Sequence, residues 1–205
     1  MNIKTKQIID ELELILGKFI SDVTTDDLNT VTELNIRNFD VDGSVLDFNV
    51  DDLNLFPYLN KISFTDMIIG NNILNYILNS NITELRFNRC ELFCNIDKPF
   101  EKIESLTIEY TDNFDEDSLL YFPNLKSLTF KGYKITKELP HNIKVLNILD
   151  TEVSDLNIIK NANLDQLFIS KKEYNNNIDF YKNNLNVFVY DDNNIYLVND
   201  GDHNE

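Results

Sequence analysis

A pattern of three apolar residues returns eight times along this chain of 205 residues. In each copy, two variable residues separate the first apolar residue from the second, and one separates the second from the third. The middle apolar residues of successive copies lie 28, 23, 21, 22, 18, 21 and 21 residues apart. The eight copies are Val31-Leu34-Ile36, Leu59-Ile62-Phe64, Ile82-Leu85-Phe87, Ile103-Leu106-Ile108, Leu125-Leu128-Phe130, Ile143-Leu146-Ile148, Leu164-Leu167-Ile169 and Leu185-Phe188-Tyr190. Such self-similarity predicts a chain of stacked units, each too small to bury its apolar side chains alone.

The last part of each copy alternates between apolar and variable residues, which is the pattern of a half-buried β-strand. In the first copy, Leu34 and Ile36 fall on one face of a strand, and Glu33, Asn35 and Arg37 fall on the other. Strands that stack in parallel would bury their apolar faces in one continuous core. We therefore expect one short strand in each copy.

The eight copies resemble the repeats of leucine-rich-repeat proteins over residues 31–190. The resemblance implies an α/β fold, a solenoid with parallel β-strands on its concave face and helical or irregular segments on its convex face. The family also has Asn or Cys three residues after the last apolar residue of the strand, and here Cys90 matches. Other copies have Phe39, Met67, Thr111, Tyr133 and Thr151 there. We therefore expect an irregular solenoid without a regular ladder of asparagines in its turns.

The residues before the first copy favour helices. Apolar residues recur there at helical spacing, and Asp26 and Asp27 favour the first turn of a second short helix after Thr24 or Thr25. The recurring apolar residues are Ile8, Leu12, Ile15, Leu16 and Phe19. The run DVTTDDLNTVTELNI is similar to the start of internalin-type repeats, and this resemblance implies a helical cap that leads into the first strand.

Three regions follow from these patterns. We expect an N-terminal helical cap at residues 1–30, about eight repeats at residues 31–198, and a disordered acidic tail at residues 199–205. Between the strands, residues 71–79 place apolar side chains on one helical face, so we expect helical and irregular segments on the convex side.

The chain is strongly acidic, with a formal net charge of −17. Such a charge disfavours binding to nucleic-acid phosphates and to anionic membrane surfaces, so we expect no nucleic-acid and no membrane partner. It would speed the encounter with a basic protein. We expect that the first 20 residues are not a secretory signal, because Asp10, Glu11 and Glu13 interrupt their apolar residues. Together with the absence of a disulfide framework, this predicts a cytoplasmic protein with reduced thiols.

No group of residues points to catalysis or to a metal. Residues 38–49 resemble a calcium-binding loop in part, but Asn49 replaces the bidentate Glu that closes such a loop, so we expect an acidic loop there. Cys90 and Cys94 lack further ligands for zinc, since the chain has two histidines, His141 and His203. We therefore expect a non-enzymatic protein without a cofactor or a metal.

The variable residues of the strands are expected to line the concave face. Four of them are basic (Arg37, Lys61, Arg86 and Lys131) and three are acidic, so this face is near neutral and the acidity must lie elsewhere. The acidic residues are Glu33, Glu84 and Glu109. The last three strands contribute apolar residues to the same face, namely Val145, Leu149, Phe168, Val187 and Val189. These form either a contact surface or a surface that residues 195–198 fold over, and the sequence leaves both open.

The pattern favours a module that binds another protein through the concave face. The candidate contact residues are Arg37, Lys61, Arg86, Glu109, Lys131, Val145, Leu149, Phe168, Val187 and Val189. The acidity suggests a specific version, an intracellular inhibitor or immunity-type protein that blocks a basic partner. The alternative is a structural scaffold in which the apolar part of the face pairs two copies.

Overall fold

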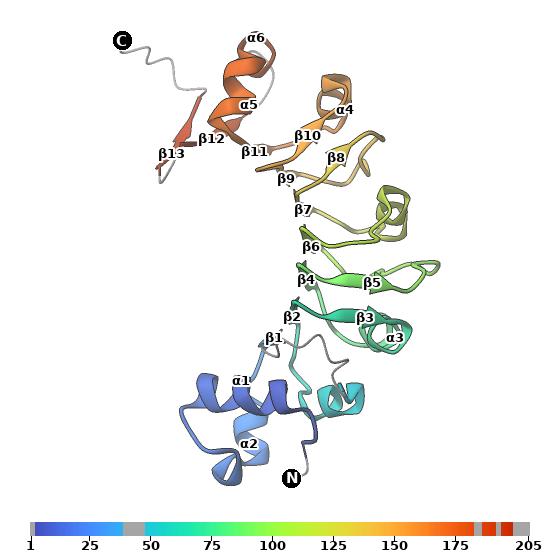
Figure 1. The fold of residues 1–205 in the computed structure, drawn as a ribbon, viewed down its shortest axis with the longest axis vertical. Helices are drawn as coiled ribbons and strands as arrows, with labels where there is room; N and C mark the ends of the chain where they lie inside the picture. Colours follow the sequence, from blue (N-terminus) through green and yellow to red (C-terminus); the bar gives the residue numbers. More distant parts are fainter. Residues whose placement is uncertain (1–2, 39–47, 183–185, 192–193, 199–205) are drawn as a thin grey trace.

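The computed structural model describes residues 3–38, 48–182, 186–191 and 194–198. Most of the calcium-loop-like segment (residues 39–47) and the acidic tail (residues 199–205) therefore lie outside the described residues. The described chain forms an arc whose inner side is lined by one long sheet, with helices and short strands on the outer side (Figure 1).

The long sheet contains nine strands in the order β1-β2-β4-β6-β7-β9-β11-β12-β13. The first eight pair in parallel and follow chain order, and β13 pairs with β12 in the antiparallel direction. The strands are β1 (Glu33–Arg37), β2 (Lys61–Thr65), β4 (Glu84–Asn88), β6 (Ser105–Glu109), β7 (Ser127–Lys131), β9 (Val145–Asn147), β11 (Gln166–Ser170), β12 (Val187–Asp191) and β13 (Asn194–Leu197). The prediction of one strand in each copy of the pattern is confirmed.

The core consists of two rows of apolar side chains that run across the sheet behind the inner face. The first row begins at Leu34 and the second at Ile36, and both residues are fully buried. Because the register pairs equivalent residues of neighbouring strands, both rows continue from β1 to β7, and the first row extends to β12. The first row continues through Ile62, Leu85, Leu106, Leu128, Leu146, Leu167 and Val187.

The end of the first row corrects the register that the sequence predicts for β12. Leu167 pairs with Val187 and Ile169 with Val189, and both valines are fully buried. The prediction that Val187 and Val189 line the concave face is therefore wrong. The run Val187–Tyr190 is apolar throughout, so its alternation cannot select a face, and a shift of one residue exchanges the two faces of a strand.

The outer side combines short helices with two small parallel sheets. The helix predicted at residues 71–79 is present as α3 (Asn71–Asn79). The other outer helices are η2 (Val50–Leu55), η3 (Glu116–Tyr121), α4 (Leu156–Asn161), α5 (Lys171–Asn176) and α6 (Ile178–Tyr181). The small sheets pair β3 (Ile68–Gly70) with β5 (Glu91–Phe93) and β8 (Lys134–Ile135) with β10 (Glu152–Val153). These elements cover the core rows from outside.

The turns after the strands contain a ladder of polar groups, although its members are not asparagines. The Cys90 thiol donates to the Phe64 carbonyl oxygen at 3.3 Å, and the Thr151 hydroxyl donates to the Phe130 carbonyl oxygen. Thr111 accepts a hydrogen bond from the backbone N–H of Cys90 at 3.3 Å. Hydroxyl and thiol groups thus form hydrogen bonds with buried backbone groups that would otherwise be unpaired and would destabilise the folded state.

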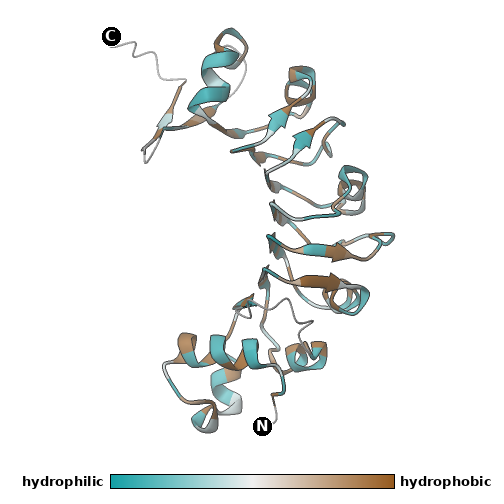
Figure 2. Ribbon diagram, viewed as in Figure 1, coloured by the Kyte–Doolittle hydropathy of each residue, from teal (hydrophilic) through white to brown (hydrophobic). Residues whose placement is uncertain are grey.

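Two helices precede the first strand, α1 (Lys6–Leu16) and α2 (Thr25–Leu28), with the short turn η1 (Ile20–Asp22) between them. Thr24 and Asp27 form a capping box at the start of α2. Ile8 and Leu12 are fully buried, whereas Ile15 and Phe19 are 46% and 74% exposed. The apolar stripe of α1 therefore buries fewer residues than its spacing predicts, and Figure 2 shows an apolar end of α1 at the rim of the arc.

A buried carboxylate ties the beginning of the chain to the outer side. The side chain of Asp52, on η2, accepts hydrogen bonds from the backbone N–H groups of Lys4 at 2.9 Å and Thr5 at 2.7 Å. In the structure Asp52 is only 4% exposed, and its carboxylate positions the residues just before α1.

Candidate functional site

The candidate site is the inner face of the long sheet, which we define as the side chains of its nine strands that point away from the core rows. The register arranges these side chains in rows across neighbouring strands. The middle row contains Asn35, Ser63, Arg86, Thr107, Thr129, Asn147, Phe168, Phe188 and Leu197. The row changes from polar to apolar between Asn147 and Phe168, which divides the inner face into two halves.

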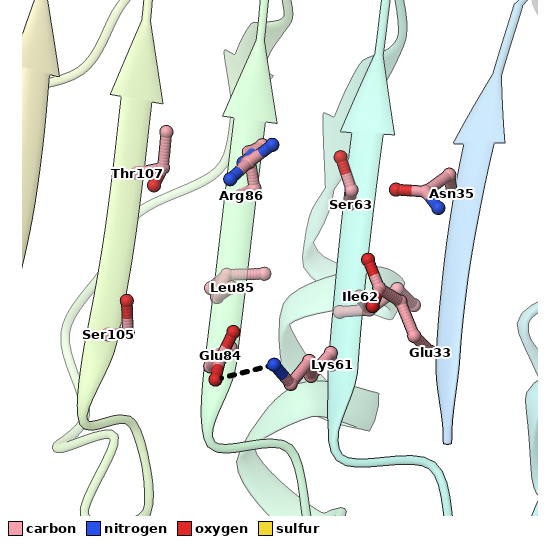
Figure 3. A pocket seen from close by; sticks show the side chains of 10 residues that line it. All are labelled: Glu33, Asn35, Lys61, Ile62, Ser63, Glu84, Leu85, Arg86, Ser105 and Thr107. Carbon is pink, nitrogen blue, oxygen red and sulfur yellow. Dashed lines mark ion pairs between the residues drawn. The ribbon is translucent and has the colours of Figure 1, made fainter.

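The polar half comprises the inner-face residues of β1, β2, β4, β6 and β7. Lys61 and Glu84 form an ion pair with Nζ and Oε1 2.9 Å apart (Figure 3), and Lys131 and Glu109 form another at the same distance. The hydrogen bond to Glu84 raises the pKa of Lys61 above its ordinary value. These residues therefore neutralise one another, which agrees with the near-neutral face that the sequence predicts.

Arg86 stands apart from these pairs. Within the described part of the chain, no carboxylate lies at ion-pair distance from Arg86 or Arg37. Arg86 lies between Ser63 and Thr107 on the neighbouring strands (Figure 3), and these three residues line a hollow of about 50 Å³. Small-molecule sites usually enclose roughly 300–1,000 Å³, so this hollow suits a single side chain of a partner better than a substrate.

The aromatic half comprises Val145, Phe168, Phe188, Tyr190, Ile195 and Leu197 on β9, β11, β12 and β13. The rings of Phe168 and Phe188 stack with centroids 4.7 Å apart and an angle of 16°, and the Tyr190 ring lies 6.1 Å from Phe168. Leu197 pairs with Phe188 and Ile195 with Tyr190, so they extend the same surface. Ile195 is 53% exposed and Leu197 is 41% exposed.

This geometry decides between the two arrangements that the sequence leaves open for residues 195–198. β13 does not fold over the apolar residues of the inner face, because it continues the sheet beside β12. The rings of Phe168, Phe188 and Tyr190 stay partly exposed. The aromatic half is therefore an open apolar surface among the described residues.

Comparisons with solved structures agree with this architecture. An internalin (inlF) from Listeria monocytogenes superposes with a TM-score of 0.56 at 14% sequence identity, over 91% of this chain and 56% of that chain. Internalin C2 (inlC2) from the same organism superposes with a TM-score of 0.53 at 20% identity, over 89% of this chain and 76% of that chain. No protein-family model matches the sequence, and no curated protein matches it.

The chain has an α/β fold of the leucine-rich-repeat type. It spans little more than half the length of the first internalin and about three quarters of the second. At such low identities the similarity establishes the fold alone.

Within this repeat fold, most of the predicted contact residues lie on the inner face. The polar half contains Arg37, Lys61, Arg86, Glu109 and Lys131, and the aromatic half contains Val145 and Phe168. Leu149 lies in the turn after β9 and is half-buried, and Val187 and Val189 belong to the core. The sequence pattern places Phe188 and Tyr190 in the core, because its register for β12 differs by one residue from that of the structure. Ile195 and Leu197 belong to β13, an antiparallel strand that the repeat pattern does not predict.

The thiols lack the properties of a nucleophile. Burial raises the pKa of Cys90 to about 11, and partial burial also raises the pKa of Cys94. Reactive thiols have a lowered pKa and a positive, accessible environment. In the ranges that the structure describes, no three His, Cys, Asp or Glu side chains gather as metal ligands, and no helix is long and apolar enough to cross a membrane.

Proposed function

We propose that this chain is a non-enzymatic module that binds a protein partner through the inner face of its sheet. The observation that supports the proposal is the aromatic half, where Phe168, Phe188 and Tyr190 form a partly exposed cluster. Large aromatic side chains that are rigid and already packed lose little conformational entropy on binding, and they dominate the energy of many protein interfaces. The polar half would orient the partner.

The charge of the molecule favours a basic partner. The inner face is nearly neutral and the net charge is −17, so most of the acidity must lie on the loops and the outer side. An acidic surround would steer a basic protein toward the face, in a manner that weakens as salt is added. This supports the more specific version of the proposal, a cytoplasmic inhibitor or immunity-type protein.

The test is capture of partners by the immobilised chain at low and moderate salt. The informative variant is Phe168→Asp with Phe188→Asp, because both rings are on the open face. Phe93→Asp with Leu120→Asp is the matched control, since these residues are 59% and 72% exposed on the outer elements β5 and η3. We expect a basic protein to be retained by the wild type and the control, and lost by the inner-face variant. Equal capture by all three proteins would refute a role for the inner face.

A second candidate function is self-assembly through the aromatic half, and the exposure of Ile195 and Leu197 favours it. Light scattering over a range of protein concentrations tests this candidate. A monomer at the highest concentration excludes it, and association that Phe168→Asp abolishes supports it.

A further inference from the structure

The two edges of the long sheet differ in how they are covered. At the β1 edge, helix α1 places Glu11 against the strand, and Oε1 of Glu11 accepts hydrogen bonds from the backbone N–H of Asn35 at 3.1 Å and from its Nδ2 at 3.2 Å. At the other edge, β13 is the last strand of the sheet, and no described residue pairs with its outer side. An uncovered edge offers a row of N–H and C=O groups to another strand.

The pairing of β12 with β13 identifies which backbone groups point outward. The backbone N–H of Val198 donates to the carbonyl oxygen of Val187 at 3.0 Å. In an antiparallel pair, every second residue turns both its N–H and its C=O toward the partner strand. Tyr196 therefore faces β12 in the same way as Val198, and the backbone groups of Ile195 and Leu197 point to the open edge.

The same two residues carry exposed apolar side chains on the inner face. Leu197 lies opposite Phe188 and Ile195 lies opposite Tyr190, and residues directly opposite in a sheet share a face. A strand added beside β13 would therefore meet two features at once. It would find unpaired backbone groups along its length and an apolar surface for every second side chain.

We propose that β13 is the docking edge for an extended segment of the partner protein, which pairs with β13 as an additional strand and lays alternate apolar side chains against Ile195, Leu197 and the aromatic half. Such strand addition is an established mode of peptide recognition. The segment is basic and does not come from a second copy, because two chains of charge −17 repel each other. The inference rests on the proposed function and specifies the part of the partner that binds, an extended segment.

Synthetic peptides provide the probe. The first peptide alternates valine and threonine over seven residues and has lysines at both ends. Two others carry N-methyl groups, one on the residues whose N–H faces β13 and the other on the residues whose N–H faces away. Because an added strand can lie in either of two registers, the binding of both methylated peptides is measured by fluorescence anisotropy and compared with that of the unmodified peptide. We expect one pattern to weaken binding at least tenfold and the other to leave it unchanged.

Variants of the full chain give an independent measurement. Leu197→Pro removes an outward N–H without removing a bond between β12 and β13, so the fold should persist, as circular dichroism would check. We expect at least tenfold weaker peptide binding for Leu197→Pro and for Ile195→Lys. The outer-side control Leu120→Lys should bind the peptide as tightly as the wild type. Hydrogen exchange should show the backbone amides of Ile195 and Leu197 becoming protected when the unmodified peptide binds.

Three outcomes would overturn the inference. One is equal binding of both methylated peptides, and another is exchange at Ile195 and Leu197 that the peptide leaves unchanged. The third is association of two copies that Leu197→Pro disrupts, since the occupant would then be a second chain. Failure of the proposed function has a different signature, because Phe168→Asp with Phe188→Asp would then leave capture of the protein partner intact.

Discussion

The polar and aromatic halves of the inner face use their side chains in opposite ways. In the polar half, Lys61 pairs with Glu84 and Lys131 with Glu109, so these four charges are satisfied within the chain. In the aromatic half, Phe168 stacks on Phe188, and the exposed sides of the rings have no cover among the described residues. Exposed ion pairs contribute little free energy, whereas desolvated aromatic side chains often dominate binding. We therefore expect affinity to reside in the aromatic half and orientation in the polar half.

The largest expected effect is the loss of stability when a charge is placed on the core side of β12 rather than on its open side. Val189→Asp places a carboxylate where the side chain is fully buried, whereas Phe188→Asp places one on the open face. We expect Val189→Asp to lower the free energy of unfolding by at least about 4 kcal/mol, because an unpaired charge would be desolvated. Phe188→Asp should cost far less. Urea denaturation of both variants measures the difference.

The same pair of variants tests the register of β12 directly. If Phe188→Asp were the more destabilising of the two, the faces of β12 would be exchanged, and the aromatic half would lose Phe188 and Tyr190. The conservative change Val189→Ala serves as a control, since it removes apolar contacts without adding a charge.

The sequence predicts the fold well where alternation is unambiguous. In β1, apolar Leu34 and Ile36 alternate with polar residues, so the strand and both of its faces follow from the pattern. In β12, every residue from Val187 to Tyr190 is apolar, and alternation carries no information about the face. The spacing of the earlier copies then selects Leu185 as the first apolar residue of the last copy, which puts Phe188 and Tyr190 in the core. The structure instead pairs Val187 with Leu167, 20 residues earlier.

Contacts between distant segments could not be predicted from the sequence. Asp52 and the backbone of Thr5 are 47 residues apart in the chain, and Glu11 and Asn35 are 24 apart. In a chain with 35 acidic residues, no local pattern distinguishes these two carboxylates from the solvent-exposed ones. The same applies to β13, whose pairing with β12 runs in the antiparallel direction, unlike the other strand pairs of the long sheet.

A second prediction compares the contributions of the two halves to binding. Phe168→Ala should raise the Kd for the protein partner about 30-fold, equivalent to about 2 kcal/mol, because the stacked ring lies at the centre of the aromatic half. Arg86→Ala should cost less than about 1 kcal/mol, since an exposed charge mainly orients a partner and speeds its approach. Isothermal titration calorimetry with the captured partner measures both values.

The salt dependence of the two variants sharpens the same comparison. Phe168→Ala should lower affinity equally at low and moderate salt, because the lost contact is apolar. Arg86→Ala should change the salt dependence, because it alters the charge of the face. A larger loss for Arg86→Ala than for Phe168→Ala at both salt concentrations would reverse the roles that we assign to the halves.

The smallest expected effect is the effect of pH on stability. It should appear in the helices that precede β1, the first strand of the polar half. The Lys18 ammonium, 2.6 Å from Oδ1, and the hydrogen bonds from Thr24 lower the pKa of Asp27 from 3.8 to about 2. The carboxylate is therefore more acidic in the folded chain than in the unfolded chain. Its stabilising contribution is complete above pH 4 and disappears as the pH falls through about 2.

Acid should accordingly loosen helix α2 before it affects the stacked rings of Phe168 and Phe188, whose contact contains no titrating group. We expect the protection factors of the α2 amides, which correct the exchange rates for the intrinsic effect of pH, to fall between pH 4 and pH 2, and expect Asp27→Asn to abolish most of that change. Nuclear magnetic resonance titration of the Asp27 carboxyl group gives its pKa directly. A value close to 3.8 would show that Lys18 does not hold this carboxylate in solution. The N-terminal helices and the aromatic half would then not be expected to differ in their sensitivity to acid.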